Sequence, residues 1–345
     1  MWAMILPLSM SLFLSGCKKD KEEPCPTVNY TTLDATIQQA VDLNAAAVEG
    51  TEIGQYQAGA KAALQTAKDL AKSVRDTECV TQAALDAANT NLLAAITVFD
   101  GKKVTDVSPA NLIAHWLFNG NANDATANGN NGTPTAGHAF WGGGAAPQLV
   151  ADRFGNANYC YHFDQGCNIE VPYSTALNPQ TLSISLWIKM EEQANNDYII
   201  AMNRWNGWKL NLQDANYLFF TVKAIYNSAE AYYDRDSNPQ AITADIWTHV
   251  VVTFTDGFMN FYVNGELAKA WDNTPGTAIA VDNINLSIGS DLPTGVYSPD
   301  DTSPFYVNWG GYFKGNIDDI RFYNIALTGA QVASIYTFEN NNVVE

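Results

Sequence analysis

The hydrophobic pattern of the chain changes its period near residue 112. Between residues 31 and 100, apolar side chains recur every three to four positions in three successive runs. This spacing places them along one face of an α-helix. Thr31 followed by Asp34 is typical of a helix start, and Gly50 of a helix end. The pattern therefore predicts a small bundle of three antiparallel helices, whose many alanines allow close packing.

From residue 112 onward, apolar positions alternate with polar ones, and turn residues separate ten or more short runs. A period of two indicates β-strands. The triplet Thr255–Gly257 and the pair Asn264–Gly265 predict tight hairpins. A polar linker over residues 101–111 separates the two patterns. We expect a mainly β protein, in which a β-sandwich or jelly roll over residues 112–338 follows a three-helix module over residues 31–100.

The N-terminus has the pattern of an export signal. Residues 1–16 are almost entirely apolar and end in small residues before Cys17. Such a run is too short to span a membrane and is typical of a signal peptide. The sequence Leu14–Cys17 (LSGC) resembles a bacterial lipobox, which implies cleavage before Cys17 and a diacylglycerol on its thiol. No Lys or Arg precedes the apolar run, which departs from the usual signal.

Residues 17–30 form a charged tether that we expect to be solvated and disordered. Its KKDKEE sequence resembles the short signals that send lipoproteins of Bacteroidetes-type bacteria to the outer face of the outer membrane. The resemblance implies a lipid-anchored, surface-exposed protein that meets the membrane only through its anchor.

Charge narrows the ligand classes. The formal net charge is −18, and aromatic residues make up 12% of the chain. Nucleic acid is a poor partner for such a chain because phosphates require Lys and Arg, and anionic lipid is disfavoured for the same reason. Neutral sugars and cations remain.

Four cysteines follow Cys17, namely Cys25, Cys79, Cys160 and Cys167. Exported proteins form disulfides, and four cysteines allow three pairings. Proximity in the sequence favours Cys25–Cys79 and Cys160–Cys167. A zinc site is disfavoured because no CxxC occurs and histidine is scarce.

Two family resemblances refine this organisation. The helical segment, with GQYQAGAKAALQTA and TQAALDAANTNLLAAI, resembles the FIVAR-type three-helix modules of bacterial surface proteins, and we interpret it as a spacer. The β segment carries AHWLFNGNANDATANGNNGT, WTHVVVTFTDGFMNFYVNGELA and GNIDDIRFYNIALTGAQVASIY in that order. These stretches resemble the laminin-G-like, concanavalin A-like jelly-roll family. That family includes sugar-binding modules, adhesion domains and a few enzymes, so the fold alone does not decide the function.

The catalytic members of that family carry Glu-x-Asp-x-Glu on one strand, since residues i, i+2 and i+4 point into the same cleft. The stretch GNIDDIRFYN contains Asp318 and Asp319, but strand alternation predicts that they lie on opposite faces, with Asn316 and Ile320 beside Asp318. Retaining glycosidases need two carboxylates that flank one bond. The sequence therefore favours a non-catalytic protein. A glycoside hydrolase, or an adhesion domain without sugar affinity, is the alternative.

The same resemblance implies a calcium site. The family often holds structural Ca²⁺ between the loop after its first strand and its last strand. This implies Asp124 with Asp318 or Asp319 as ligands, because Ca²⁺ prefers oxygen donors. The alternatives are that the Asn-rich loop around Asp124 forms ordinary turns, and that Asp319 pairs with Arg321.

Sugars present C–H faces that stack on aromatic rings, and hydroxyls that bond to planar polar groups. Bulky aromatic residues in loops rich in Gly, Pro and Asp are harder to explain by core packing than those inside strands. Rings that cap the ends of the sandwich are the alternative explanation. The candidate sugar-binding residues are Trp205, Trp208, Tyr232, Tyr233, Tyr297, Asn308 and Trp309. The sequence thus predicts a lipoprotein that binds glycans as an accessory to polysaccharide capture, with other outer-membrane glycan-uptake proteins as partners.

Overall fold

The computed structural model describes residues 24–50, 54–281 and 283–341. The expected signal peptide, Cys17 and the first part of the tether lie outside these ranges. No helix within the ranges is both long enough and apolar enough for a membrane span.

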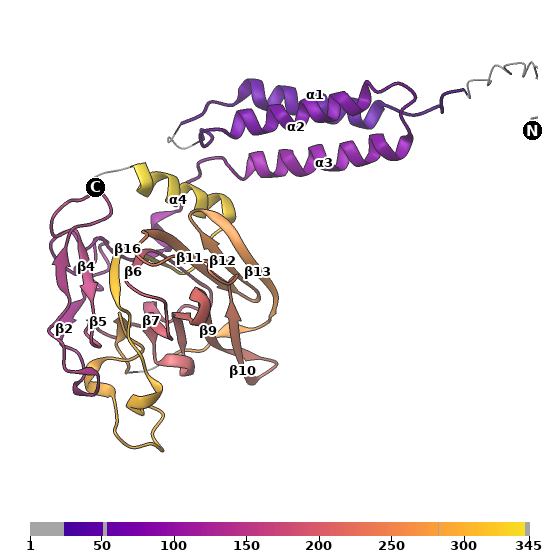
Figure 1. The fold of residues 1–345 in the computed structure, drawn as a ribbon. Helices are drawn as coiled ribbons and strands as arrows, with labels where there is room; N and C mark the ends of the chain where they lie inside the picture. The colour runs from indigo at the N-terminus through magenta and orange to yellow at the C-terminus, as the bar shows by residue number, and fades with distance from the viewer. Residues whose placement is uncertain (1–23, 51–53, 282, 342–345) are drawn as a thin grey trace, which may run out of the picture. The chain divides into compact units, whose positions relative to one another are not determined.

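The chain divides into two compact units, one with residues up to Ala45 and Leu64–Ala95, the other with Ala46–Ala63 and Ile96–Glu345. Figure 1 shows the three N-terminal helices and the β-sandwich. The helices are α1 (Thr31–Ala46), α2 (Ala60–Arg75) and α3 (Gln82–Asp100), as the apolar spacing predicts.

The helical unit is closed by leucine packing and a disulfide. Leu33, Leu64 and Leu92 are each 1% exposed, so each of the three helices contributes a buried leucine. Cys25 and Cys79 form a disulfide, which confirms that predicted pairing.

Two antiparallel sheets face each other in the sandwich (Figure 1). The first has the order β13-β12-β11-β6-β16-β4-β3, with β1 also paired to β16. The second has the order β10-β9-β8-β7-β15-β5-β2, with β14 paired to β9. The strands of the first sheet are β1 (Leu112–Trp116), β3 (Gln148–Val150), β4 (Cys160–Phe163), β6 (Leu182–Met190), β11 (Thr248–Thr255), β12 (Gly257–Val263), β13 (Glu266–Thr274) and β16 (Gly315–Tyr323). The strands of the second are β2 (Thr133–Thr135), β5 (Asn168–Val171), β7 (Asp197–Met202), β8 (Trp208–Gln213), β9 (Tyr217–Tyr226), β10 (Ala229–Asp236), β14 (Thr277–Ala278) and β15 (Leu286–Ile288).

The first sheet is covered on both faces. Its inner face meets the second sheet in one large apolar core that contains Ile184, Leu186 and Phe220. Helix α4 (Gly329–Asn341) packs on its outer face through Val332. Burial on both sides explains why β6 and β11 are buried along almost their whole length, including polar residues such as Ser183 and Ser185.

Turn chemistry confirms both predicted hairpins. Gly257, at the β11–β12 turn, has φ +90°. Asn264 and Gly265 join β12 to β13 with φ values of 49° and 80°. Two consecutive residues with positive φ are the reason that Asn-Gly is favoured in such turns.

The closing strand β16 does not alternate as the sequence predicts. Its pairing with β6 shifts register between Asp318 and Arg321, and Asp319 has φ +50°. This bulge turns the two neighbouring acids towards the same partner, since both contact Arg153. The expectation that Asp318 and Asp319 lie on opposite faces is therefore wrong, because the bulge interrupts the pleat.

The predicted Cys160–Cys167 disulfide is also wrong. Both thiols are free and buried. The Cys160 thiol donates to the carbonyl of Ala151 at 3.1 Å, and the Cys167 sulfur accepts from the backbone N–H of Asp164 at 3.4 Å. Seven residues of separation in sequence say nothing about the geometry that a disulfide requires.

Candidate functional site

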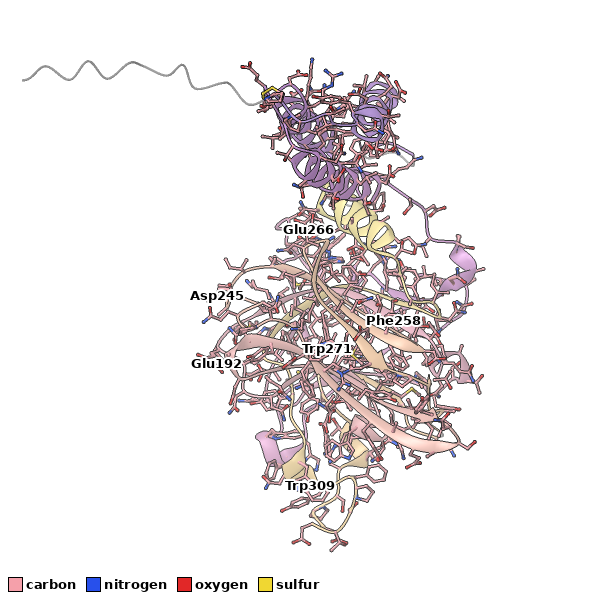
Figure 2. The ribbon with its side chains drawn as sticks, turned by 90° about the vertical axis from the view of Figure 1, so that its right-hand side faces the viewer. Glu192, Asp245, Phe258, Glu266, Trp271 and Trp309 are labelled. Atoms are coloured by element: carbon pink, nitrogen blue, oxygen red, sulfur yellow. A yellow bond between two sulfur atoms is a disulfide. The ribbon has the colours of Figure 1, made fainter. Side chains whose placement is uncertain are left out.

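Three aromatic rings gather at one end of the sandwich. Trp205 belongs to a short 3₁₀ turn, Arg204–Asn206, between β7 and β8, whereas Tyr306 and Trp309 lie in the long segment between β15 and β16. The ring centroids of Trp205 and Trp309 are 6.3 Å apart, and those of Tyr306 and Trp309 are 5.4 Å apart. Trp309 is 46% exposed, and Asn308 beside it is exposed. We call Trp205, Tyr306 and Trp309 the aromatic platform; Figure 2 shows Trp309 at the end of the sandwich opposite Glu266.

A buried ion pair supports this platform. Arg204 and Asp291 are both fully buried, and the Arg204 Nε–H donates to Asp291 Oδ2. Arg204 Nη1 also donates to the carbonyl of Pro304 at 3.2 Å. Its guanidinium carbon lies 5.3 Å from the centroid of the Trp205 ring. The pair therefore joins the turn that carries Trp205 to the segment that carries Trp309.

The second oxygen of Asp291 extends this connection. Asp291 Oδ1 accepts from the Tyr297 hydroxyl at 2.6 Å and from the backbone N–H of Gly311 at 3.2 Å. A Cβ on Gly310 would lie 2.8 Å from Asp291 Oδ1 and 2.9 Å from Arg204 Nη2. Only glycine lets the chain pass this closely over the ion pair.

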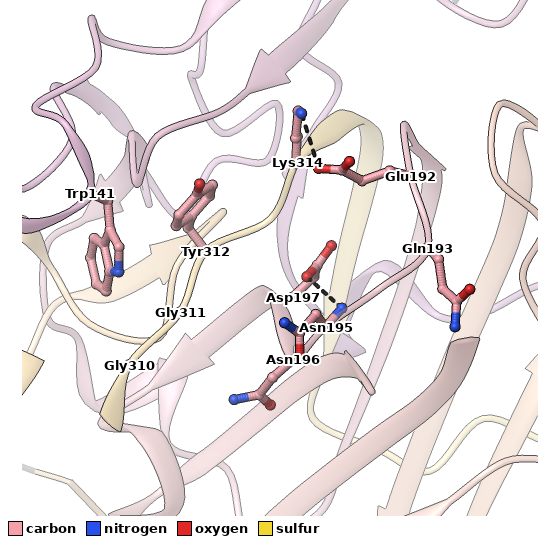
Figure 3. Close-up of a pocket in the computed structure, with 10 residues that line it drawn as sticks. All are labelled: Trp141, Glu192, Gln193, Asn195, Asn196, Asp197, Gly310, Gly311, Tyr312 and Lys314. Atoms are coloured by element: carbon pink, nitrogen blue, oxygen red, sulfur yellow. Dashed lines mark hydrogen bonds and ion pairs between the residues drawn. The ribbon is translucent and has the colours of Figure 1, made fainter. Parts of the chain in front are cut away.

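A polar pocket of about 500 Å³ adjoins the platform through the same chain segment. Three loops form it: the loop before β7, the segment before β16 and the end of the turn Ala139–Trp141. Figure 3 shows the rings of Trp141 and Tyr312 on one side and Asp197 on the other. We call this the polar pocket; its lining residues are Trp141, Glu192, Gln193, Asn195, Asn196, Asp197, Gly310, Gly311, Tyr312 and Lys314.

Three ionisable side chains set the charge of the polar pocket. Glu192 Oε1 lies 3.0 Å from Lys314 Nζ (Figure 3). Asp197 Oδ1 accepts from the backbone N–H of Asn195 at 3.1 Å. Burial raises the pKa of Asp197 to about 6, and the negative charge of Glu192 adds to this shift. Asp197 is consequently mostly ionised at neutral pH and becomes protonated in mild acid.

The predicted sugar-binding residues divide into two groups. Trp205 and Trp309 lie side by side, Asn308 adjoins Trp309 in the chain, and all three are at least partly exposed, so their role in sugar binding stays a prediction. Trp208 is 1% exposed and stacks on Phe322 in the core, so its assignment to sugar binding is wrong. Tyr297 is 8% exposed, and its hydroxyl donates to Asp291, so its ring is not free to stack on a sugar as the sequence predicts.

The two tyrosines at 232 and 233 are not in a loop, because they belong to strand β10. Alternation along that strand places Tyr233 in the core, where its hydroxyl donates to the carbonyl of Pro275. Its assignment to a sugar site is therefore wrong. Tyr232 is 47% exposed, and its ring lies 5.4 Å from Lys223 Nζ.

Sequence analysis missed Trp141 and Asp197. Trp141 follows the same rule as Trp309, a large ring in a glycine-rich loop, since three glycines come directly after it. Asp197 begins a strand whose other residues are buried, and no sequence signal marks it.

The predicted calcium ligands have other partners here. Asp124 Oδ1 accepts from the backbone N–H groups of His115 and Thr126, and Oδ2 accepts from that of Asn130. Each accepting oxygen therefore closes a turn of the loop, as expected for Asx motifs. Among the described residues, no group of three or more His, Cys, Asp or Glu side chains has the arrangement of a metal site.

Asp318 and Asp319 share an arginine. Arg153 contacts Asp318 at 2.6 Å and Asp319 at 3.2 Å, and His115 Nε2 lies 2.7 Å from Asp319 Oδ1. Arg321 also pairs with Asp319 at 3.7 Å, which confirms the alternative ion pair. Burial opposes ionisation of Asp319, but the hydrogen bond from His115 and the charge of Arg321 lower its pKa overall. In this structure Arg153 supplies the positive charge that balances the two acids. Calcium at Asp124 with Asp318 or Asp319 stays a prediction.

One family model matches residues within the sandwich. Residues 163–333 match the model of the concanavalin A-like lectin/glucanases superfamily, and the two antiparallel sheets agree with it. A surface-layer 125 kDa protein of Lysinibacillus sphaericus is 37% identical over 99 residues, which cover 29% of this chain and only 8% of that protein.

Two solved structures have similar folds. Domain 4 of AbnA, a GH43 extracellular arabinanase from Geobacillus stearothermophilus in complex with arabinotriose, is 22% identical with a TM-score of 0.47, over 66% of this chain and 98% of that one. The binding domain of Paraclostridial mosquitocidal protein 1 is 16% identical with a TM-score of 0.47, over 67% and 53%.

Proposed function

We propose that the sandwich binds a glycan without cleaving it, through the aromatic platform and the polar pocket. One observation carries this proposal: Trp309 is exposed, and the three residues after it lead directly into a pocket lined by amides and carboxylates. Aromatic rings stack on the C–H faces of sugars, and amide and carboxylate groups bond to their hydroxyls. The two kinds of surface that a sugar needs thus follow each other along one segment.

The wider setting of this function is part of the proposal. A disulfide in the helical unit and the partial match to a surface-layer protein support an extracellular location. A lipid anchor at Cys17, an outer-membrane position and a role as accessory to polysaccharide capture rest on sequence resemblance. We propose the helices as a spacer, since Tyr56 and Phe99, the two aromatic residues of segment 31–100, stack on each other.

A glycoside hydrolase is the second candidate, because the polar pocket holds two acids, Glu192 and Asp197, and the pKa of Asp197 is raised. A raised pKa is what a general acid needs. Glu192, however, is paired with Lys314 rather than poised as a nucleophile. Release of reducing sugar by the purified protein is the observation that favours hydrolysis over binding alone.

A glycan-array screen tests the function. The full chain is applied to arrays of neutral and acidic glycans, beside the Trp309→Ala variant. Binding that is lost in the variant supports the proposal, and the absence of any hit contradicts it. A parallel arm with chelator tests calcium: the calcium prediction requires a lower melting temperature after chelation, and an unchanged one contradicts it.

A further inference from the structure

The geometry points to a narrower ligand class: we infer that the polar pocket takes an uncharged sugar unit and rejects uronates, sialates and sulfated sugars. This inference rests on the proposed function, since it concerns which glycan the same site accepts. It follows from the charge of the residues that line the pocket and of the buried ion pair next to it.

The side chains that line the pocket carry a net negative charge. Two carboxylates, Glu192 and Asp197, and one ammonium group, that of Lys314, are the ionisable acids and bases among the lining residues. The Lys314 ammonium lies 3.0 Å from the Glu192 carboxylate, so these two charges balance each other. Among the described residues Asp197 forms no ion pair, and Lys314 offsets its charge only from a distance. An acidic sugar would place a second negative charge near Asp197. Like charges in a partly desolvated site repel more strongly than in bulk water.

The cation next to the pocket, Arg204, does not offset this negative charge. Arg204 is the cation beneath Gly310, but it is fully buried and its charge is matched by Asp291. The guanidinium is also held by the carbonyl of Pro304 and by the Trp205 ring. Because Arg204 is fully buried and its charge is balanced by the buried carboxylate of Asp291, it does not present a free positive charge to a ligand in the pocket.

The pocket has an apolar wall and a hydrogen-bond acceptor, both of which suit a neutral sugar. The rings of Trp141 and Tyr312 have centroids 5.8 Å apart at an angle of 60°, and they form an apolar wall (Figure 3). Opposite the wall, the carboxylate of Asp197 accepts hydrogen bonds from hydroxyls, which neutral sugars supply in pairs. Hydrogen bonds to a charged acceptor are stronger than those between neutral groups.

The aromatic platform and the polar pocket lie close enough for one oligosaccharide to contact both. Trp309 and Tyr312 are separated by only two glycines, a contour of at most about 11 Å for three peptide units. A chain of several sugar units can therefore contact the aromatic platform and the polar pocket together. The expected ligand is a neutral oligosaccharide rather than a single sugar.

The experiment has two stages. In the first, the full chain is screened against neutral and acidic oligosaccharides, and the inference predicts that the hits are neutral. In the second, the primary hydroxyls of the best neutral hit are oxidised to carboxylates. Its affinity is expected to fall at least tenfold at pH 7.5, and this loss should shrink in Asp197→Asn.

Asp272→Asn, an exposed acid on β13, a strand that contributes no residue to the polar pocket, serves as the matched control and should leave the tenfold loss unchanged. Melting curves verify that each variant is folded. Hits that are mainly acidic, or an oxidised oligosaccharide that binds as well as its parent, overturn the inference while leaving glycan binding intact. An array without any hit overturns the proposed function itself, so the two failures are distinguishable.

Discussion

Gly310 shows how a single residue without a side chain shapes the site. Its backbone passes over the Arg204–Asp291 ion pair and also lines the polar pocket. Sequence analysis identified the large rings nearby, because rings in glycine-rich loops are visible in a sequence. It could not identify Gly310, since the contact with Arg204 joins positions about a hundred residues apart.

Gly310→Ala is expected to destabilise the fold by about 1–3 kcal/mol, the usual cost of forcing extra volume into a packed site. The added Cβ would lie within 3 Å of both members of the ion pair. Urea unfolding measures the loss. Gly295→Ala is the matched control in the same segment, because a Cβ there meets no atom within 4 Å; equal stability of the two variants would contradict the assigned contact.

Asp197 gives the site a pH dependence of known sign. Its pKa in the folded protein is about 6, above the ordinary value of 3.8, so the folded state holds more protons than the unfolded state between these pH values. Its contribution to stability is therefore present in acid and lost as the pH rises through 6. Denaturant unfolding from pH 4 to 7 should show a smaller decline with pH in Asp197→Asn than in the wild type, and identical slopes would contradict the raised pKa.

At the scale of elements, periodicity and turn chemistry predicted most of the fold. The β11–β12 and β12–β13 hairpins depend on local residues, and these are visible in the sequence. The sequence around Tyr232 and Tyr233 resembles a loop because polar residues follow them, and only pairing with β9 makes it strand β10. The bulge at Asp319 was hidden for a similar reason, since its partners Arg153 and His115 are distant in the sequence.

Helix α4 is held on the first sheet by a buried acid. Glu339 accepts from the Trp187 indole N–H at 2.8 Å and from Arg321 Nε at 2.6 Å. Glu339→Ala removes both acceptors, and we expect a loss of roughly 3–5 kcal/mol, as for other buried pairs that lose one partner. Urea unfolding checks this, with the exposed neighbour Asn340→Ala as control; a loss below 1 kcal/mol would show that the contacts do not hold the helix.

At the scale of the whole molecule, the two units differ in how they are stabilised. The sandwich has a large apolar core, whereas the helical unit is small and carries the Cys25–Cys79 bond across 54 residues. A small unit buries a lower fraction of its surface and gains more from a cross-link. Proximity in the sequence favours this disulfide and also the Cys160–Cys167 disulfide, which does not form. Sequence separation contains no information on distance in space.

Reduction should therefore lower the stability of the helical unit by roughly 2–4 kcal/mol and leave the sandwich almost unchanged. Circular dichroism followed during heating, with and without reductant, separates the helical transition from the β transition. Alkylation of the unfolded, unreduced chain should label Cys160 and Cys167 and spare Cys25 and Cys79. A shift of the β transition on reduction, or labelled Cys25, would contradict this assignment.

Calorimetric titration with the best glycan hit tests the central claim, that the aromatic platform binds the ligand. Trp205→Ala with Trp309→Ala is expected to raise the Kd at least tenfold, about 1.4 kcal/mol. Phe258→Ala is the control, because Phe258 is a 54% exposed ring on β12, away from the platform (Figure 2). The account predicts that the control binds like the wild type. A double variant that binds as tightly as the wild type would contradict it.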